Sequence, residues 1–286
     1  MLHWVQSNLF GRGGLSMSLR GRFFYKSRKF YDDDFDWNTY TADSYERRLV
    51  GVVEQENQAV AKSGELSFDG ATGRVVASGR PIHPNQQAIL EAIGQLQPRS
   101  VHEVGCGAGD HLANGRALYP DISFSGADRG QTQLDLAAKR HPELAKSLSL
   151  QDLTMPFSHH WPRADFVYSQ TVLMHIHTAV SHFVALANMV NSADRFVLLM
   201  ENQQCHNFVS DIGNLWRGGH FSWQTMHMYR FDGSTGARTI LLSKEERDLP
   251  VLTSDDQLRE GLEPSKRRLK RADEGSARGM FGVPIA

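Results

Sequence analysis

Cysteine is scarce in this chain of 286 residues, which has only Cys106 and Cys205 and no CxxC spacing. This scarcity argues against a disulfide scaffold and a cysteine zinc site, and it suits a reducing compartment. Long apolar runs are also missing, because no stretch approaches the 18 or more apolar residues of a transmembrane helix. The net charge is only -1, so the overall charge does not suggest nucleic acid as a partner. We therefore expect a cytoplasmic protein without a transmembrane segment.

The distribution of charge divides the chain into four parts. Residues 1–31 hold six basic residues and no acidic one, and they lack the continuous apolar stretch of a signal peptide. We interpret them as a flexible basic extension, with a transit-like segment or a surface-binding arm as alternatives. Residues 32–84 then form an N-terminal lid and hairpin, 85–244 form the core, and 245–286 form a polar tail that we predict to be disordered.

From residue 100 onward, short apolar stretches alternate with stretches of helical periodicity. Such alternation is typical of a parallel sheet that is covered by helices. The predicted strands are 100–104, 122–127, 148–150, 164–169 and 195–201, and the predicted helices between them are 112–118, 131–140 and 180–190.

Further elements are predicted on both sides of this alternating region. Before it come a helix at 45–62, a short hairpin at 66–77 and a helix at 86–96. After it come two strands, 222–231 and 239–242, which are joined by an Asp-Gly-Ser-Thr-Gly turn. The predicted fold class is α/β, with a doubly wound, mostly parallel seven-stranded sheet and a C-terminal antiparallel hairpin.

A glycine-rich loop follows the first predicted strand and reads Glu103-Val104-Gly105-Cys106-Gly107-Ala108-Gly109-Asp110. Glycine allows unusual backbone dihedral angles and lets a ligand approach closely. The dinucleotide fingerprint is GxGxxG, whereas the spacing here is GxGxG, and Asp110 stands where the third dinucleotide glycine would fall. A carboxylate such as Glu103 would repel a pyrophosphate, but it suits a cationic ligand group.

This loop resembles the first motif of the class I (Rossmann-like) S-adenosylmethionine-dependent methyltransferases, E/D-x-G-x-G-x-G. The resemblance covers about residues 85–244. It implies a methyltransferase with S-adenosyl-L-methionine as its cofactor. It also implies that the loop contributes cofactor-binding residues, namely Glu103, Gly105, Cys106, Gly107 and Gly109. We interpret Cys106 as a small side chain within this loop and not as a nucleophile.

Further positions agree with the family in order and spacing. Asp128 ends the second strand, where the family binds the ribose of the cofactor, and a carboxylate there can accept both ribose hydroxyls. Asp152 and Leu153 follow the third strand, where the family often has an acidic residue close to the adenine amino group. Ser169 lies in a stretch that resembles the family's fourth motif. Without this register, Asp128 would be an ordinary loop residue, and Asp152 would be ambiguous.

His175 is the candidate general base. It follows the fourth strand, at the edge of the sheet where open α/β folds bind ligands, and a pKa near 6.5 suits a base at neutral pH. The alternative is that His175 packs beside the cofactor or caps the next helix. His175 and His177 are two residues apart, and such residues do not face each other on a helix. We find no further Asp or Asn ligands nearby, so we expect no metal site.

Polar and aromatic residues gather after the fifth strand. The candidate acceptor-binding residues are His177, Glu201, His206 and Trp216. Aromatic walls with polar groups suit a polar, ring-shaped acceptor such as a sugar, and an ordinary surface insertion is the alternative. We therefore predict O-methylation of a small polar acceptor, a glycan or a specialised metabolite. N-methylation and protein methylation stay open on the same fold, as do a nicotinamide-dependent oxidoreductase and a non-catalytic binding module.

Overall fold

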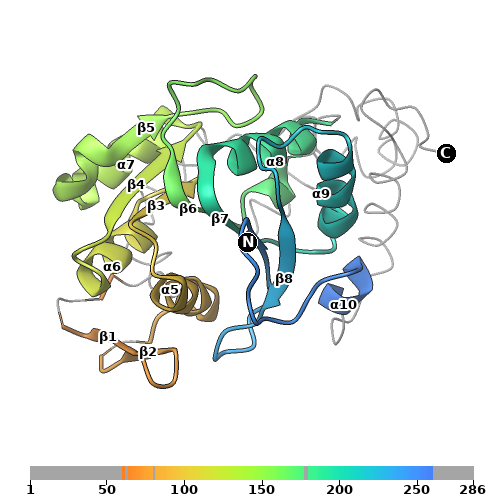
Figure 1. The fold of residues 1–286 in the computed structure, drawn as a ribbon. Helices are drawn as coiled ribbons and strands as arrows, with labels where there is room; N and C mark the ends of the chain where they lie inside the picture. The colour runs from red at the N-terminus through yellow and green to blue at the C-terminus, as the bar shows by residue number, and fades with distance from the viewer. Residues whose placement is uncertain (1–59, 62–63, 80, 177–179, 260–286) are drawn as a thin grey trace, which may run out of the picture.

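The computed structural model describes residues 60–61, 64–79, 81–176 and 180–259 (Figure 1). The predicted basic extension lies outside the described residues, and so does nearly all of the predicted helix at 45–62. His177 also lies outside them. Within the described ranges, no helix is both long enough and apolar enough to cross a membrane.

A seven-stranded sheet has the order β5-β4-β3-β6-β7-β9-β8 (Figure 1). The strands are β3 (Ser100–Val104), β4 (Ser123–Asp128), β5 (Leu148–Leu150), β6 (Ala164–Gln170), β7 (Ala193–Met200), β8 (His227–Phe231) and β9 (Thr239–Ser243). Strands β3 to β7 are parallel to one another, whereas β9 runs antiparallel to both β7 and β8. The predicted fold class, including the C-terminal antiparallel hairpin, is confirmed.

The chain changes direction across the sheet between β3 and β6. Strands β4 and β5 extend the sheet on one side of β3, and β6 and β7 extend it on the other side. Such a switch point creates a crevice outside the carboxyl ends of the central strands, where open α/β sheets bind ligands. Because Val104 pairs with Ser169 in register, the two strands end close together at this crevice.

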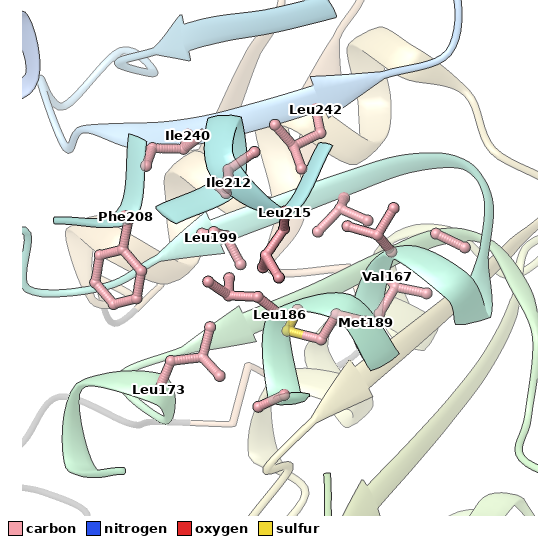
Figure 2. Close-up of a cluster of buried hydrophobic side chains, with 14 of the residues drawn as sticks. Val167, Leu173, Leu186, Met189, Leu199, Phe208, Ile212, Leu215, Ile240 and Leu242 are labelled. Atoms are coloured by element: carbon pink, nitrogen blue, oxygen red, sulfur yellow. The ribbon is translucent and has the colours of Figure 1, made fainter. Parts of the chain in front are cut away.

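Helices cover both faces of the sheet. On one face, α8 (Ser181–Ser192) and α9 (Phe208–Arg217) enclose the apolar cluster of Figure 2. On the other face, α5 (Pro84–Leu96), α6 (Asp110–Leu118) and α7 (Gln131–Arg140) contribute to a second cluster. Figure 1 shows α5 and α6 on the side of the sheet that lies away from α8 and α9.

Strand β7 is buried on both faces because its apolar residues alternate between the two clusters. Val197 and Leu199 belong to the cluster with α8, while Phe196 and Leu198 belong to the cluster with α5. Successive side chains of a strand point to opposite faces of a sheet. This arrangement explains the uninterrupted apolar sequence at the end of this strand, which is typical of parallel sheets.

The predicted N-terminal hairpin is present as β1 (Leu66–Asp69) and β2 (Arg74–Ala77). A fully buried carboxylate on α5, that of Glu91, fixes its position. This carboxylate accepts hydrogen bonds from the backbone amides of Val75, at 3.1 Å, and Ser234, at 2.6 Å. Glu91 therefore joins the hairpin to α5 and to the turn between β8 and β9.

Two segments differ from the predictions. The strand predicted at 222–231 begins only at His227, because Trp223 is instead buried in the core and its indole donates a hydrogen bond to the carbonyl oxygen of Ala193. The tail predicted from residue 245 is structured as far as Arg259 and includes α10 (Asp255–Arg259). This segment is polar in composition, but two of its residues, Leu252 and Leu258, are buried and hold it against the core.

Candidate functional site

The glycine loop lies at the carboxyl end of β3, beside the switch point of the sheet. All three of its glycines have a positive φ, of 69° at Gly105, 52° at Gly107 and 79° at Gly109. Residues with a side chain rarely adopt such angles. A Cβ atom on Gly105 would also lie only 2.4 Å from Cγ2 of Val172, in the turn after β6. The loop sequence is therefore required by its backbone shape and by its close contact with the next strand.

Gly107 is the glycine that leaves space beside the loop. The nearest atom to a Cβ built on it would be Oε1 of Gln133, at 3.7 Å. Cys106, in contrast, is buried against β4, where Gly126 makes room for it. Burial raises the pKa of the Cys106 thiol well above its usual value, which makes it a poor nucleophile.

Glu103 lies next to the end of β3, and its side chain is 1% exposed. Its Oε1 is 2.8 Å from Nδ1 of His111, in the first turn of α6. Burial alone would lower the pKa of His111, but the charge and hydrogen bond of Glu103 outweigh this effect and raise the pKa. Tyr168 is opposite Glu103 on β6, and burial, followed by the Glu103 charge, raises the pKa of its phenol.

Asp128 joins the glycine loop to the loop after β4. Its carboxylate accepts a hydrogen bond from the Gly107 amide at 3.1 Å and from the Gly130 amide at 2.8 Å. Burial raises the pKa of Asp128, although these two amides act in the opposite direction. The carboxylate thus lies at the crevice and holds two loops together there, and its contact with a ribose stays a prediction.

Buried polar atoms without a partner gather at this edge of the sheet. In the part of the chain that the structure describes, twelve side-chain atoms are buried and make no hydrogen bond, and they include five near the carboxyl ends of β3, β4, β5 and β6. We call these five the open polar set, and they are Glu103 Oε2, His111 Nε2, Gln133 Oε1, Gln151 Oε1 and Gln170 Oε1. Buried polar groups are almost always paired in folded proteins, so these atoms mark a region where hydrogen-bond partners are missing.

The open polar set includes four residues that the sequence-based prediction missed: His111, Gln133, Gln151 and Gln170. Each of them lies within seven residues of a strand end that was predicted to within one residue. Their positions after parallel strands were therefore a usable signal, but uncharged amides and a single histidine do not form a recognisable motif.

Asp152 and Leu153 follow β5, as expected. Oδ1 of Asp152 accepts hydrogen bonds from the amide and the hydroxyl of Thr154, at 2.9 and 2.7 Å. Leu153 is buried, and its carbonyl oxygen accepts a hydrogen bond from the Asn188 side chain of α8. These contacts fix the loop after β5 at the edge of the crevice, and contact with an adenine stays a prediction.

Glu201 lies directly after β7 and binds the turn that follows β6. Its Oε1 accepts hydrogen bonds from the hydroxyl of Ser169, at 2.7 Å, and from the amide of Val172, at 3.1 Å. Its Oε2 accepts a hydrogen bond from the amide of Met174, at 3.1 Å. Burial raises the pKa of Glu201. The carboxylate therefore fixes the short 3-10 helix η4 (Leu173–His175), whose last residue is the candidate base.

Thr171, at the start of this turn, has a φ of 56°. A β-branched residue at positive φ is strained, and such strain is concentrated at functional sites, at a cost of about 1–3 kcal/mol. The turn that carries the half-buried His175 is therefore held in one shape by Glu201 and by its contact with Gly105.

His206 contacts this turn, whereas Trp216 lies on α9. His206 is buried and stacks on His182 with a ring separation of 4.2 Å, and its Nε2 is 3.2 Å from the carbonyl oxygen of Leu173. Trp216, on α9, packs against the core cluster beside Phe221. Helix α9 itself was not predicted, although Phe208, Ile212 and Leu215 have helical spacing. The structure thus brings His206 to the turn and places Trp216 in the packing of α9.

Metal ligands were not expected at this site. Among the residues that the structure describes, no group of three or more histidine, cysteine, aspartate or glutamate side chains is arranged to hold a metal ion.

No protein-family model matches this chain, and no curated protein matches it. Among solved structures it is similar to an amino pentose methyltransferase of calicheamicin biosynthesis from Micromonospora echinaspora, with 22% identity, coverage of 42% of this chain and 50% of that chain, and a TM-score of 0.37. It is also similar to magnesium protoporphyrin IX methyltransferase from Synechocystis PCC 6803, with 18% identity, coverage of 75% and 98%, and a TM-score of 0.44. The chain thus spans about half the length of the first protein and nearly all of the second.

A third similar structure is a TehB-like S-adenosylmethionine-dependent methyltransferase from Corynebacterium glutamicum, with 17% identity, coverage of 59% of this chain and 91% of that chain, and a TM-score of 0.44. The strand order of this chain, the glycine loop after β3 and Asp128 at the end of β4 agree with the motif resemblance. On these features, the chain has the fold of the class I S-adenosylmethionine-dependent methyltransferases.

Proposed function

We propose that this protein is an S-adenosylmethionine-dependent methyltransferase that methylates an oxygen atom of a small polar acceptor, a glycan or a specialised metabolite. The observation that carries the proposal is the buried Glu103 carboxylate, whose Oε2 belongs to the open polar set beside three glycines of positive φ. A buried carboxylate oxygen needs a donor, and the ammonium group of the cofactor's methionine part supplies one.

Residues from three neighbouring strand ends would hold the cofactor. Glu103 would bind its amino acid part, Asp128 its ribose, and Gln151 with Asp152 its adenine. When bound, S-adenosylmethionine supplies an activated methyl group on a sulfonium. The chain's own contribution is to bind and orient both reactants and to exclude water, with the acceptor atom about 3 Å from the methyl carbon.

His175 would accept the proton of a hydroxyl acceptor. It ends the turn that Glu201 binds, and this turn also contacts the glycine loop through Val172 and Gly105. The candidate base is thereby positioned relative to the cofactor loop by the same contacts that shape that loop. An amine acceptor that binds in its neutral form would need no such base, so the atom that is methylated is identified from the product and not from His175 alone.

The cofactor site is tested by isothermal titration of the full chain with S-adenosylhomocysteine. We expect micromolar binding that is lost in Gly107→Arg, which fills the space beside the loop, and in Asp128→Ala. His160→Gln, at an exposed position, is the matched control and should bind like the wild type. Binding of NADH in place of S-adenosylhomocysteine would refute the proposal in favour of an oxidoreductase.

The acceptor is tested by transfer of a labelled methyl group to panels of sugars, phenolic metabolites, amines and peptides. We expect product on oxygen. If His175 is the base, the rate of methyl transfer should increase with pH in the wild type, and this increase should be absent in His175→Gln while S-adenosylhomocysteine still binds. Product found only on nitrogen, or only on peptides, would refute the acceptor part of the proposal. Cofactor binding without turnover on any panel would instead indicate a binding module.

A further inference from the structure

Glu103 and His111 form a buried pair in which each side chain has one remaining polar atom. Oε1 of Glu103 and Nδ1 of His111 are 2.8 Å apart, while Glu103 Oε2 and His111 Nε2 both belong to the open polar set. The side chains are 1% and 14% exposed, respectively. Both remaining atoms thus belong to side chains that meet at the carboxyl end of β3.

The hydrogen bond between the two side chains determines what they offer to a ligand. A carboxylate can only accept hydrogen bonds, so Nδ1 of His111 must carry the shared proton. In the imidazolium form Nε2 carries a proton as well, and the raised pKa of His111 favours that form. The pair then presents an anionic acceptor, Glu103 Oε2, beside a cationic donor, His111 Nε2.

Other titratable groups surround this pair. Asp110, on α6, adds a favourable charge for the imidazolium. Burial, and then the charge of His111, lower the pKa of His83, which lies before α5. Around Glu103, the carboxylate of Asp128, the thiol of Cys106 and the phenol of Tyr168 are further titratable groups that interact with it.

We propose that His111 is a cofactor-binding residue that pairs with the carboxylate of the methionine part, while Glu103 pairs with the adjacent ammonium. The two charges of an amino acid zwitterion are opposite in sign, and so are the two groups that the Glu103–His111 pair presents, a carboxylate oxygen and an imidazolium N–H. This inference rests on the proposed function, and it adds that cofactor affinity depends on the protonation of His111.

The experiment measures ligand binding and needs no acceptor. S-Adenosylhomocysteine and 5′-methylthioadenosine, which lacks the amino acid part, are titrated into the wild type, His111→Gln and the control His160→Gln between pH 6 and 8.5. We expect His111→Gln to bind S-adenosylhomocysteine about ten- to hundredfold more weakly at pH 6, which is the range for loss of a charged hydrogen bond. Binding of 5′-methylthioadenosine should change less than about threefold, since it cannot reach His111.

The pH dependence provides a second readout. Wild-type affinity for S-adenosylhomocysteine should fall toward that of His111→Gln as the pH rises through the pKa of His111. The slope that remains in His111→Gln reports titrating groups other than His111, the ligand's own amino group among them. By linkage, the pKa of His111, followed by NMR, should rise when S-adenosylhomocysteine binds and stay constant with 5′-methylthioadenosine.

The inference is overturned if His111→Gln binds S-adenosylhomocysteine as tightly as the wild type at pH 6, or if the pKa of His111 falls on binding. In either case, retained binding of 5′-methylthioadenosine would leave the proposed function intact. Failure of the wild type to bind both nucleosides would instead refute the proposed function itself.

Discussion

Acid should destabilise this protein through His102, in the middle of the central strand β3. The side chain is buried, Nδ1 is 2.8 Å from Oγ of Ser125, and Nε2 has no partner among the described residues. Burial therefore lowers the pKa of His102 to about 4. In the unfolded chain a histidine has a pKa of about 6.5, so the unfolded state takes up this proton first as the pH falls.

The magnitude follows from this difference. Between pH 6.5 and pH 4 the unfolded state binds more protons at this residue, so stability decreases as the pH falls. A shift of about 2.5 pKa units at about 1.36 kcal/mol per unit corresponds to about 3 kcal/mol. This is a large fraction of the 5–15 kcal/mol that is typical of folded domains. The full contribution is present above pH 6.5 and is lost near pH 4.

Urea unfolding of the wild type and His102→Gln across this pH range tests the argument. Glutamine can keep a hydrogen bond to Ser125 but does not titrate. The wild type should therefore lose about 3 kcal/mol more than the variant between pH 6.5 and pH 4, with unchanged m-values. His160→Gln, at an exposed position, should follow the wild type. Parallel pH profiles of the wild type and His102→Gln would refute the reasoning.

Three further predictions concern the crevice. Gly105→Ala should lower the free energy of unfolding in urea by about 3 kcal/mol, because it adds a contact of 2.4 Å with Val172 to an unfavourable φ of 69°. Gly107→Ala has no close neighbour and should lower it by only about 1 kcal/mol. Equal losses in the two variants would contradict the loop geometry. Thr171→Gly should raise stability by up to about 1 kcal/mol by relieving a φ of 56°, and a measured loss of stability would show that the turn is not strained. Glu201→Ala should leave the affinity for S-adenosylhomocysteine, measured by calorimetry, within about threefold of the wild type. The kcat for methyl transfer should fall at least about tenfold, because the backbone amides of the turn with His175 lose the carboxylate that accepts their hydrogen bonds. An equal loss of affinity would place Glu201 in the cofactor site instead.

The central sheet was predictable because its signals are local. Apolar strands, glycine turns and amphipathic helices recur in the order that a doubly wound sheet requires, and the motif at Glu103 identified the loop. The start of β8 was not predictable, because Trp223 is of a residue type that is common in strands but is buried in the core before the strand begins. Likewise, Leu252 and Leu258 are isolated apolar residues in a polar stretch, and only the tertiary fold shows that they share a core.

The candidate site was predictable in part for the same reason. Residues in the glycine loop were found through a motif, whereas the pairing of Glu103 with His111 depends on how β3 and α6 meet. Glu201 was expected to contact an acceptor, which stays a prediction, and its carboxylate binds the amides of the turn after β6. Sequence position placed this residue correctly at the end of β7, and only the structure shows which groups its oxygens bind.

Three buried glutamates differ in how many of their carboxylate oxygens accept hydrogen bonds. Glu91 is 0% exposed, Glu103 is 1% exposed and Glu201 is 7% exposed. Both oxygens of Glu91 and of Glu201 accept hydrogen bonds from the protein, whereas, within the described residues, only one oxygen of Glu103 does. Leaving a buried carboxylate oxygen without a donor costs at least about 1–3 kcal/mol, and within the described residues one oxygen each of Asp110 and Asp211 is also left so. At Glu103, binding of a cationic ligand group would recover this cost.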